Sequence, residues 1–393
     1  MRSLSRRRLA GALAAVGLIA ALVVPATSIG SGKKGLGLPT KIGKGEGALN
    51  VIEWPAYTDA SFAKPFEKQT GCKIHRKDAG TSNQMVALMR AGGGGGGGQY
   101  DLVSASGDAS LRLIYAGDVV PVNVKLIPSW KDFLPAFKSP PHNTVKGVHY
   151  GISLQWGPNT LIYNTKKVKP APTSWSSIYS PKYKGKITVP NNPIQIADAA
   201  LYLMKTNPSL GIKDPYELTK PQFNATVALL KSQKPLLKRY WLYPADDIKD
   251  YKTGDAVIGA TWPYQTLQLQ AAGVPVKEIV PKEGVTGWAD TWMLTKRAPH
   301  PNCAYKWMAY AATPHVQAQQ ALVFGETPVN PKACPYMNKI TAGSCAGYHL
   351  NAPAAYAKSI RFWKTPVKPC GWGGRTDCMD IQAWDNAWAS ITG

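Results

Sequence analysis

Acidic residues are scarce in this sequence: 23 aspartates and glutamates stand against 46 lysines and arginines, a formal net charge of +23. Such a charge often indicates a nucleic-acid partner. The lysines are scattered singly rather than gathered in runs, which argues against nucleic acid. We expect instead a solvated surface that meets an anionic cell wall or lipid.

Catalytic and metal-binding motifs are missing. There is no G-x-S-x-G, no H-E-x-x-H and no C-x-x-C, and the six histidines have no ligand spacing. The glycine run Gly92–Gly98 lacks the Gly-Lys-Ser/Thr ending of a phosphate-binding loop and predicts a flexible surface loop. We therefore expect no enzyme, no cofactor and no metal, with a hydrolase built from distant residues as the alternative.

Long apolar runs are missing too, except near the start. Four arginines precede an apolar run over Leu9–Val24, and small residues follow up to Ser28. This order is typical of a secretory signal peptide, and the run is short for a membrane span. We predict a signal peptide over 1–28, with an uncleaved anchor as the alternative, and a flexible linker over 29–48. The protein would be exported to the periplasm or the cell surface.

The six cysteines fit an oxidising compartment. Six cysteines allow fifteen pairings, so the connectivity is a hypothesis. Proximity in the sequence favours the pairs Cys334–Cys345 and Cys370–Cys378. The pair then left over is Cys72–Cys303.

Strand and helix patterns alternate along the chain. The buried strand "LNVIEW" is followed by a helical stretch that Asp59 can cap and Gly71 can end. The strand "KGKITVPNN" is followed by the helical "IQIADAALYLMKT". A chain of 393 residues is too long for one comfortable core. We predict an α/β protein with two lobes.

One short segment points to a binding site. In "GWADTWM", strand alternation would put Trp288, Asp290 and Trp292 on the same face. An acidic, aromatic face in so basic a chain suggests a site for a small organic cation, although Trp292 could equally pack behind it.

Several segments together resemble a known family. The order "NVIEWPAYTD", "YDLVSAS", "SWSSIYSPKYKGKITV", "IGATWPYQT", "VPKEGVTGWADTWML" and "FGETPVNP" is similar to that of the solute-binding proteins of ABC importers, in the spermidine/putrescine branch. The resemblance spans about Leu49 to Asn330 and is most specific at Ser174–Ile187 and Pro281–Asp290.

The resemblance implies a periplasmic-binding-protein-like fold of type II. Two doubly wound lobes would be joined by crossing hinge strands, with a ligand cleft between them. Lobe 1 would comprise 49–154 plus 291–329, and lobe 2 would comprise 155–290 plus 330–393, which includes the C-terminal tail. Such a protein would act as a monomer and deliver its ligand to a membrane permease.

The resemblance also implies site residues, because polyamine binders of this family hold methylene chains between aromatic rings and ammonium groups with carboxylates. The positions that match the family's pattern are Trp54 and Tyr57 as a first aromatic pair, Trp262 as a stacking ring, and Trp288 with Asp290 as its Trp-x-Asp. We expect binding to be lost in Asp290→Asn and in Trp262→Ala.

This chain departs from the family at four positions. Asn192 and Gln195 stand where acidic residues are usual, and amides supply no net charge. Asp108 stands near a usual tyrosine, where it either binds ligand or caps a helix, and Glu326 stands near an expected aromatic residue. Acidity has moved from one lobe to the other, or the ligand carries less charge than spermidine.

Three functions follow from these patterns. The first is a solute-binding protein for a putrescine-like or spermidine-like amine. The second is the same fold holding a zwitterion such as an amino acid or betaine, with its carboxylate at the helix that starts near Thr81. The third is a secreted basic module that binds anionic wall polymers.

Overall fold

The computed structural model describes residues 38–352, 356, 358–368, 370 and 376–393. The predicted signal peptide and residues 29–37 of the predicted linker lie outside this part. Over the described residues, no helix combines the length and the apolar composition that crossing a membrane requires. The compact unit Leu38–Gly393 contains two main sheets.

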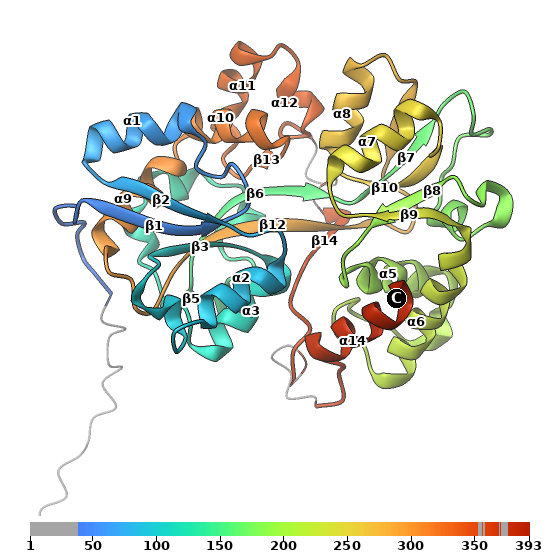
Figure 1. Ribbon diagram of the computed structural model, residues 1–393, viewed down its shortest axis with the longest axis horizontal. Coiled ribbons are helices and arrows are strands. Elements are labelled where there is room, and N and C mark those ends of the chain that lie inside the picture. The colour runs from blue at the N-terminus through green and yellow to red at the C-terminus, as the bar shows by residue number, and fades with distance from the viewer. Residues whose placement is uncertain (1–37, 353–355, 357, 369, 371–375) are drawn as a thin grey trace, which may run out of the picture. The chain divides into compact units, whose positions relative to one another are not determined.

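The first main sheet has seven strands in the order β13-β6-β12-β3-β1-β2, with β14 paired to β12. Its strands are β1 (Ala48–Glu53), β2 (Lys73–Asp78), β3 (Leu102–Ser106), β6 (Ile152–Pro158), β12 (Val285–Leu294), β13 (Thr327–Pro328) and β14 (Ile360–Phe362). The helices drawn around it in Figure 1 are α1 (Ala60–Thr70), α2 (Ser82–Arg90), α3 (Gly107–Ala116), α9 (Pro301–Ala311) and α10 (Pro314–Phe324).

The second main sheet has five strands in the order β11-β7-β10-β8-β9. They are β7 (Thr160–Asn164), β8 (Ile187–Pro190), β9 (Leu237–Trp241), β10 (Ile258–Thr261) and β11 (Val276–Ile279). Its helices, α5 (Gln195–Thr206), α6 (Lys220–Gln233), α7 (Pro244–Thr253) and α8 (Pro263–Ala271), lie on two sides of the sheet (Figure 1). The C-terminal α14 (Ile381–Thr392) lies beside α6.

Shorter elements connect these layers. They are η1 (Gly95–Gly98), η2 (Val124–Leu126), η3 (Pro128–Asp132), α4 (Pro135–Lys138), β4 (Thr144–Val145), β5 (Val148–His149), η4 (Trp175–Ile178), η5 (Pro181–Tyr183), η6 (Pro208–Leu210), η7 (Lys234–Leu236), η8 (Pro331–Ala333), α11 (Cys334–Ile340) and α12 (Ser344–Gly347).

The ends of α1 follow from its sequence. Asp59 accepts a hydrogen bond from the Ser61 amide and so caps the first turn, and Gly71 ends the helix in the left-handed region at φ 73°. The glycine run behaves differently from the prediction. All seven glycines have positive φ, Gly95 and Gly96 are buried, and the Gly95 amide donates to Asp118 Oδ1 at 3.0 Å. The run is a compact turn rather than a loose surface loop, and only glycine adopts such a backbone readily.

The chain passes from one sheet to the other at narrow crossings. β6 ends at Pro158 in the first sheet and β7 begins at Thr160 in the second, so Asn159 alone separates them. β11 of the second sheet is followed by β12 of the first, after five residues. The predicted class, a periplasmic-binding-protein-like α/β fold, is confirmed by this architecture and by the solved structures described below.

Three disulfides form in the described part of the chain, and their pairing confirms the prediction. They are Cys72–Cys303, Cys334–Cys345 and Cys370–Cys378.

Candidate functional site

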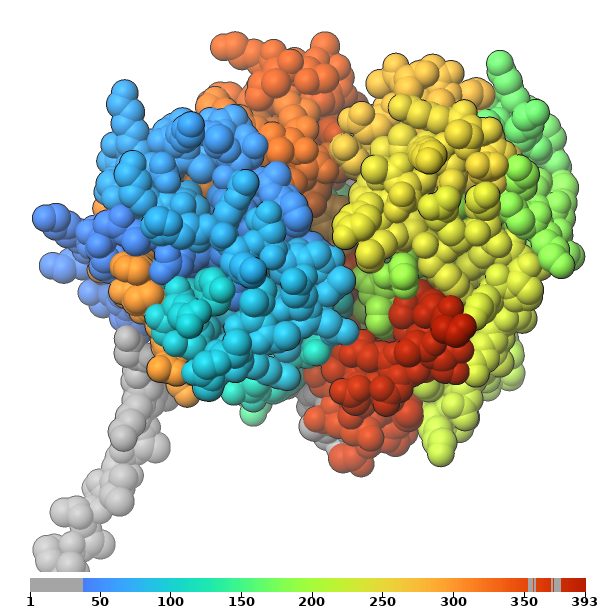
Figure 2. Space-filling model, in the orientation of Figure 1, coloured from blue at the N-terminus to red at the C-terminus, as the bar shows by residue number. Residues whose placement is uncertain are grey.

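A cavity of about 470 Å³ opens where strands of both main sheets end. Figure 2 shows the hollow between the blue segments of the first sheet and the yellow segments of the second. Residues that directly follow strands, or close them, line the cavity: Trp54 after β1, Ser106 at the end of β3, Asn191 after β8, Leu242 after β9 and Trp262 after β10. In α/β folds, ligands bind at these carboxyl ends of strands.

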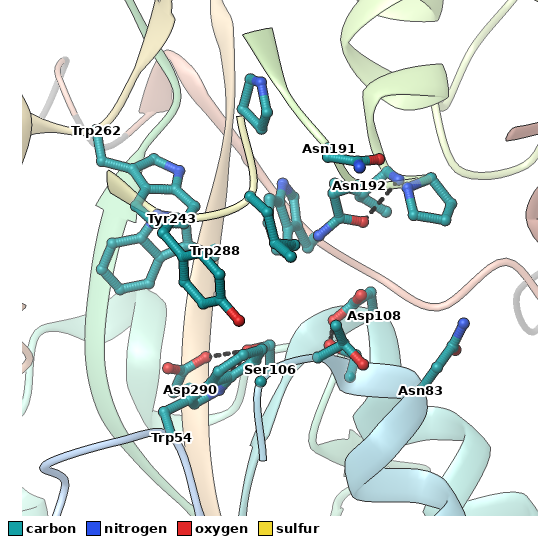
Figure 3. Close-up of a pocket in the computed structure, with 18 of the residues that line it drawn as sticks. Trp54, Asn83, Ser106, Asp108, Asn191, Asn192, Tyr243, Trp262, Trp288 and Asp290 are labelled. Carbon is teal, nitrogen blue, oxygen red and sulfur yellow. Dashed lines mark hydrogen bonds between the residues drawn. The ribbon is translucent and has the colours of Figure 1, made fainter. Parts of the chain in front are cut away.

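A buried carboxyl group lies at the floor of the cavity. Asp290 is 3% exposed, and in β12 it lies where the register against β6 shifts, a bulge that re-aims the side chain. Its Oδ1 accepts a hydrogen bond from the Ser106 hydroxyl at 2.5 Å, and Ser106 Oγ accepts one from the Trp54 indole at 3.1 Å. Figure 3 shows Asp290, Ser106 and Trp54 together. Serine and tryptophan thus fix the carboxylate without neutralising it.

A second carboxyl group shares the hydroxyl of Tyr57 with Asp290. Tyr57 donates to Asp290 Oδ2, and its oxygen also lies 3.0 and 3.1 Å from the two carboxylate oxygens of Glu326. A phenol has one proton, so it cannot satisfy both carboxylates. Burial raises the pKa of Asp290 to about 7, and burial together with the charge of Asp290 raises the pKa of Glu326 well above its usual range. Near neutral pH the pair therefore holds a proton that a bound cation can replace.

Two further carboxyl groups line the cavity. Asp108 is 6% exposed and accepts from the Ser82 hydroxyl at 2.8 Å, and Asp385 reaches the cavity from α14. Burial raises the pKa of Asp108, and the negative charge of Asp385 adds to this rise. No lysine, arginine or histidine is found among the described residues that line the cavity. In a chain with a formal charge of +23, the described lining of this cavity supplies four acidic groups and no basic one.

Tryptophans form one wall. Trp262 meets Trp241 edge to face at a centroid distance of 4.9 Å, and meets Trp288 in the same way at 6.2 Å. Trp288 lies directly on Gly157 of β6, where a Cβ would collide with the indole ring. Figure 3 shows Trp262, Trp288 and Tyr243 gathered on one side of the cavity, across from Trp54. Indole faces attract cations through the ring quadrupole.

A buried polar network holds Trp262 and a further indole ring, that of Trp363. The Trp262 indole donates to Asn159 Oδ1 at 2.9 Å, at the crossing between the sheets. The amide of Asn159 donates to Thr286 Oγ1 at 2.9 Å, and the Trp363 indole approaches the same oxygen at 3.3 Å. Thr286 in turn donates to Asp198, whose pKa burial raises to about 7. The crossing point thus sets the orientation of the aromatic wall.

The cavity brings together eight of the nine residues predicted from the sequence: Trp54, Tyr57, Asp108, Asn192, Trp262, Trp288, Asp290 and Glu326. Gln195 does not line it; it is the first residue of α5 and is buried. The sequence analysis missed Ser106, Tyr243, Trp363 and Asp385, which line the cavity as well. Trp292 is fully buried behind the site, with its ring centroid 6.3 Å from that of Tyr57.

The family model described as bacterial extracellular solute-binding protein matches residues 61–342. The chain belongs to this family. Its match covers most of both main sheets and ends before β14 and α14.

Among curated proteins, the spermidine/putrescine-binding periplasmic protein of Escherichia coli is 23% identical over 299 residues, which are 76% of this chain and 82% of that protein. A putative spermidine/putrescine ABC transporter protein from Listeria monocytogenes has a solved structure with a TM-score of 0.71 and 18% identity, covering 88% of this chain and 98% of that chain. The PBP MotA of A. tumefaciens B6, solved with glucopine, has a TM-score of 0.64 and 17% identity, covering 87% and 99%. Likeness at this level establishes the fold and leaves the ligand open.

Proposed function

We propose that this solute-binding protein captures a small organic amine of the putrescine or spermidine type. The observation that carries the proposal is the charge of the cavity: four carboxyl groups and several indole faces, without a basic side chain among the described lining residues. A cavity of this kind, in an otherwise basic protein, is suited to a cation. Curated relatives that bind spermidine and putrescine support the same class of ligand.

The interactions are strong enough for a useful affinity. A cation desolvated over an aromatic face gains about 2 kcal/mol, and a charge-assisted hydrogen bond contributes about 1.5–3 kcal/mol. Micromolar binding requires about 8 kcal/mol after the costs of ordering. Contacts with Trp262 and Trp54 and bonds to Asp290 and Glu326 reach this range.

A zwitterion is the weaker candidate. Gly80, Thr81 and Ser82 at the start of α2 line the cavity and offer a helix N-terminus to a carboxylate. However, the Ser82 hydroxyl is committed to Asp108, and the carboxylate of the ligand would lie close to that buried acid. Like charges at such a site repel.

We infer that the protein is exported and acts as the binding component of an ABC importer, handing its amine to a membrane permease. Membership of the extracellular solute-binding family and the relatives named above support this role. Hinge closure at the crossing near Asn159 would enclose the ligand.

A thermal-shift screen tests the proposed ligand class. Putrescine and spermidine are expected to raise the melting temperature, since a ligand at a hundredfold excess over its Kd stabilises by about 2.7 kcal/mol. The matched probe is 4-aminobutyrate, which has the same four-carbon chain as putrescine but carries a carboxylate at one end. Stabilisation by 4-aminobutyrate or betaine at equal concentration, without stabilisation by either amine, would refute the proposal.

Amine binding should depend on pH with a definite sign. The pKa of Asp290 in the empty site is about 7, and an ammonium group favours the ionised carboxylate, so the complex has a lower pKa. Binding then releases protons near neutral pH, and the affinity rises from pH 6 to pH 8 and levels off above it. Calorimetry at these two pH values, in two buffers of different ionisation enthalpy, measures both effects. An affinity that is flat or falls over this range would contradict the assignment.

A further inference from the structure

We propose that the C-terminal helix α14 completes the cavity with a second ammonium site, in which Asp385 and Asp108 hold the distal charge of a diamine or longer polyamine. This inference rests on the proposed function and names the residues that would set the number of charges on the ligand. The family match ends at residue 342, yet Trp363, Ile381 and Asp385 all line the cavity. The tail is therefore part of the site.

The segment after β14 is hydrogen-bonded to β12 of the first sheet and to the start of α3. The Trp363 amide donates to the Gly287 carbonyl at 2.7 Å, and the Thr365 hydroxyl donates to the Gly107 carbonyl at 3.1 Å. Gly107 also lies so close to the backbone of Trp363 that a Cβ there would collide with it. Gly107 immediately precedes Asp108, so the tail is fixed beside the carboxylate at this end of the cavity.

The same tail also makes polar contacts with segments around the second main sheet. The ammonium group of Lys364 lies 2.7 Å from Asp214 and 2.6 Å from Glu217. The Cys370–Cys378 disulfide closes the tail before α14, and the Trp388 indole donates to Asn191 Oδ1 at 2.9 Å. Trp384 is fully buried in the same cluster as Phe223 of α6. Asp385 therefore stands at a fixed position rather than on a free end.

The charged groups around Asp385 leave one negative charge that a bound cation can balance. Asp385 is half-buried and interacts with Asn83 and Arg112, and its Oδ1 is buried without a hydrogen-bond partner. Asn83 lines the cavity and accepts from Arg112 Nη1 at 2.5 Å. Burial raises the pKa of both Asp108 and Asp385; when both are ionised, they outweigh the single guanidinium of Arg112 by one negative charge. Figure 3 shows Asp108 and Asn83 at the end of the cavity away from Trp262.

The two ends then have matching charge. At the first end, Asp290 and Glu326 share one proton and so carry a single negative charge. At the second end, Arg112 offsets one of the two carboxylates, and a single negative charge remains there as well. Aromatic rings, including those of Trp288 and Trp363, also line the cavity, and methylene groups can pack on them. This arrangement fits a cation with two separated ammonium groups better than a monoamine, because each end would bind one ammonium.

The test compares putrescine with butylamine, which has the same carbon chain and one ammonium group. We expect Asp385→Asn to weaken putrescine binding about tenfold in calorimetry and to leave butylamine within about twofold, since one charge-assisted bond is lost. Asp108→Asn, which leaves α14 untouched, is expected to show the same selective loss. Asp255→Asn is the matched control: this half-exposed carboxylate lies before β10 and faces Lys238 at 3.9 Å.

Three other outcomes would overturn either the second ammonium site or the proposed function. Equal weakening of both amines by Asp385→Asn would mean that Asp385 only ties α14 to Asn83 and Arg112, and this would overturn the second site. Unchanged putrescine binding in both variants would overturn it too. A wild-type protein that binds neither amine would overturn the proposed function itself, which is a different result from the first two.

Discussion

Removing both carboxyl groups at the first end, Asp290→Asn with Glu326→Gln, should weaken putrescine and spermidine binding by about a thousandfold. Two charge-assisted hydrogen bonds, each worth about 1.5–3 kcal/mol, are lost, and each 1.4 kcal/mol is tenfold in Kd. The ammonium group would then be desolvated beside neutral amides. Calorimetry with wild type and double variant measures the loss.

The single variants are expected to be much milder, about tenfold each, which replaces the complete loss that the sequence alone suggested for Asp290→Asn. The charge of Asp290 helps to raise the pKa of Glu326, so the carboxyl left behind ionises more readily. The losses in the single variants should therefore sum to less than the loss in the double variant. A double variant that binds amines as well as either single variant would contradict the role of this pair.

The ligand-free double variant should not be less stable than wild type at pH 8. The pKa values of both carboxyl groups are raised in the folded protein, so the folded state holds more protons than the unfolded state above about pH 4. The free energy of unfolding therefore falls as pH rises through about 7, and amides remove this loss. Thermal unfolding at pH 5.5 and pH 8 separates this effect from a loss of folding.

Removing the Cys72–Cys303 disulfide should lower the free energy of unfolding by about 5 kcal/mol, because it closes a long loop in the unfolded chain. The two cysteines are 231 residues apart, and every strand of the second main sheet lies between them. Both are fully buried, so alanine is the suitable replacement in the double variant. Urea unfolding of wild type and variant measures the difference.

The Cys334–Cys345 disulfide provides the matched control. It closes a loop of 11 residues, for which the same model gives about 3 kcal/mol. None of these four cysteines lines the cavity, so amine affinity should stay unchanged wherever the variants are folded. Equal losses of stability in the two double variants would contradict the argument from loop length.

Strand ends made much of the site predictable. A tryptophan that follows a buried strand and precedes a proline, as Trp54 and Trp262 do, lies at a carboxyl end where cavities form in α/β folds. Trp288 and Asp290, which strand alternation placed on one face with Trp292, both line the cavity, whereas Trp292 is buried behind it. These features are local, but the resemblance to solute-binding proteins was needed to assign these residues to a ligand rather than to the core.

The parts that escaped prediction depend on contacts between distant segments. The amphipathic pattern of α14 shows that Trp384 and Trp388 are buried, but not which surface receives them. Asp385 reaches the cavity only because the tail is fixed between Gly107 and Asn191. Gln195 was expected in the site from the resemblance to the family, but it begins α5, is buried and does not line the cavity.

Native mass spectrometry in a competition among four small solutes tests the central claim most directly. The ligand-free protein is mixed with equal amounts of putrescine, spermidine, 4-aminobutyrate and betaine, and the mass of the bound species is read. We predict a one-to-one complex with putrescine or spermidine that is missing from the Asp290→Asn/Glu326→Gln variant. A complex dominated by 4-aminobutyrate or betaine, or an amine complex that persists in that variant, would contradict a cavity built for a cation.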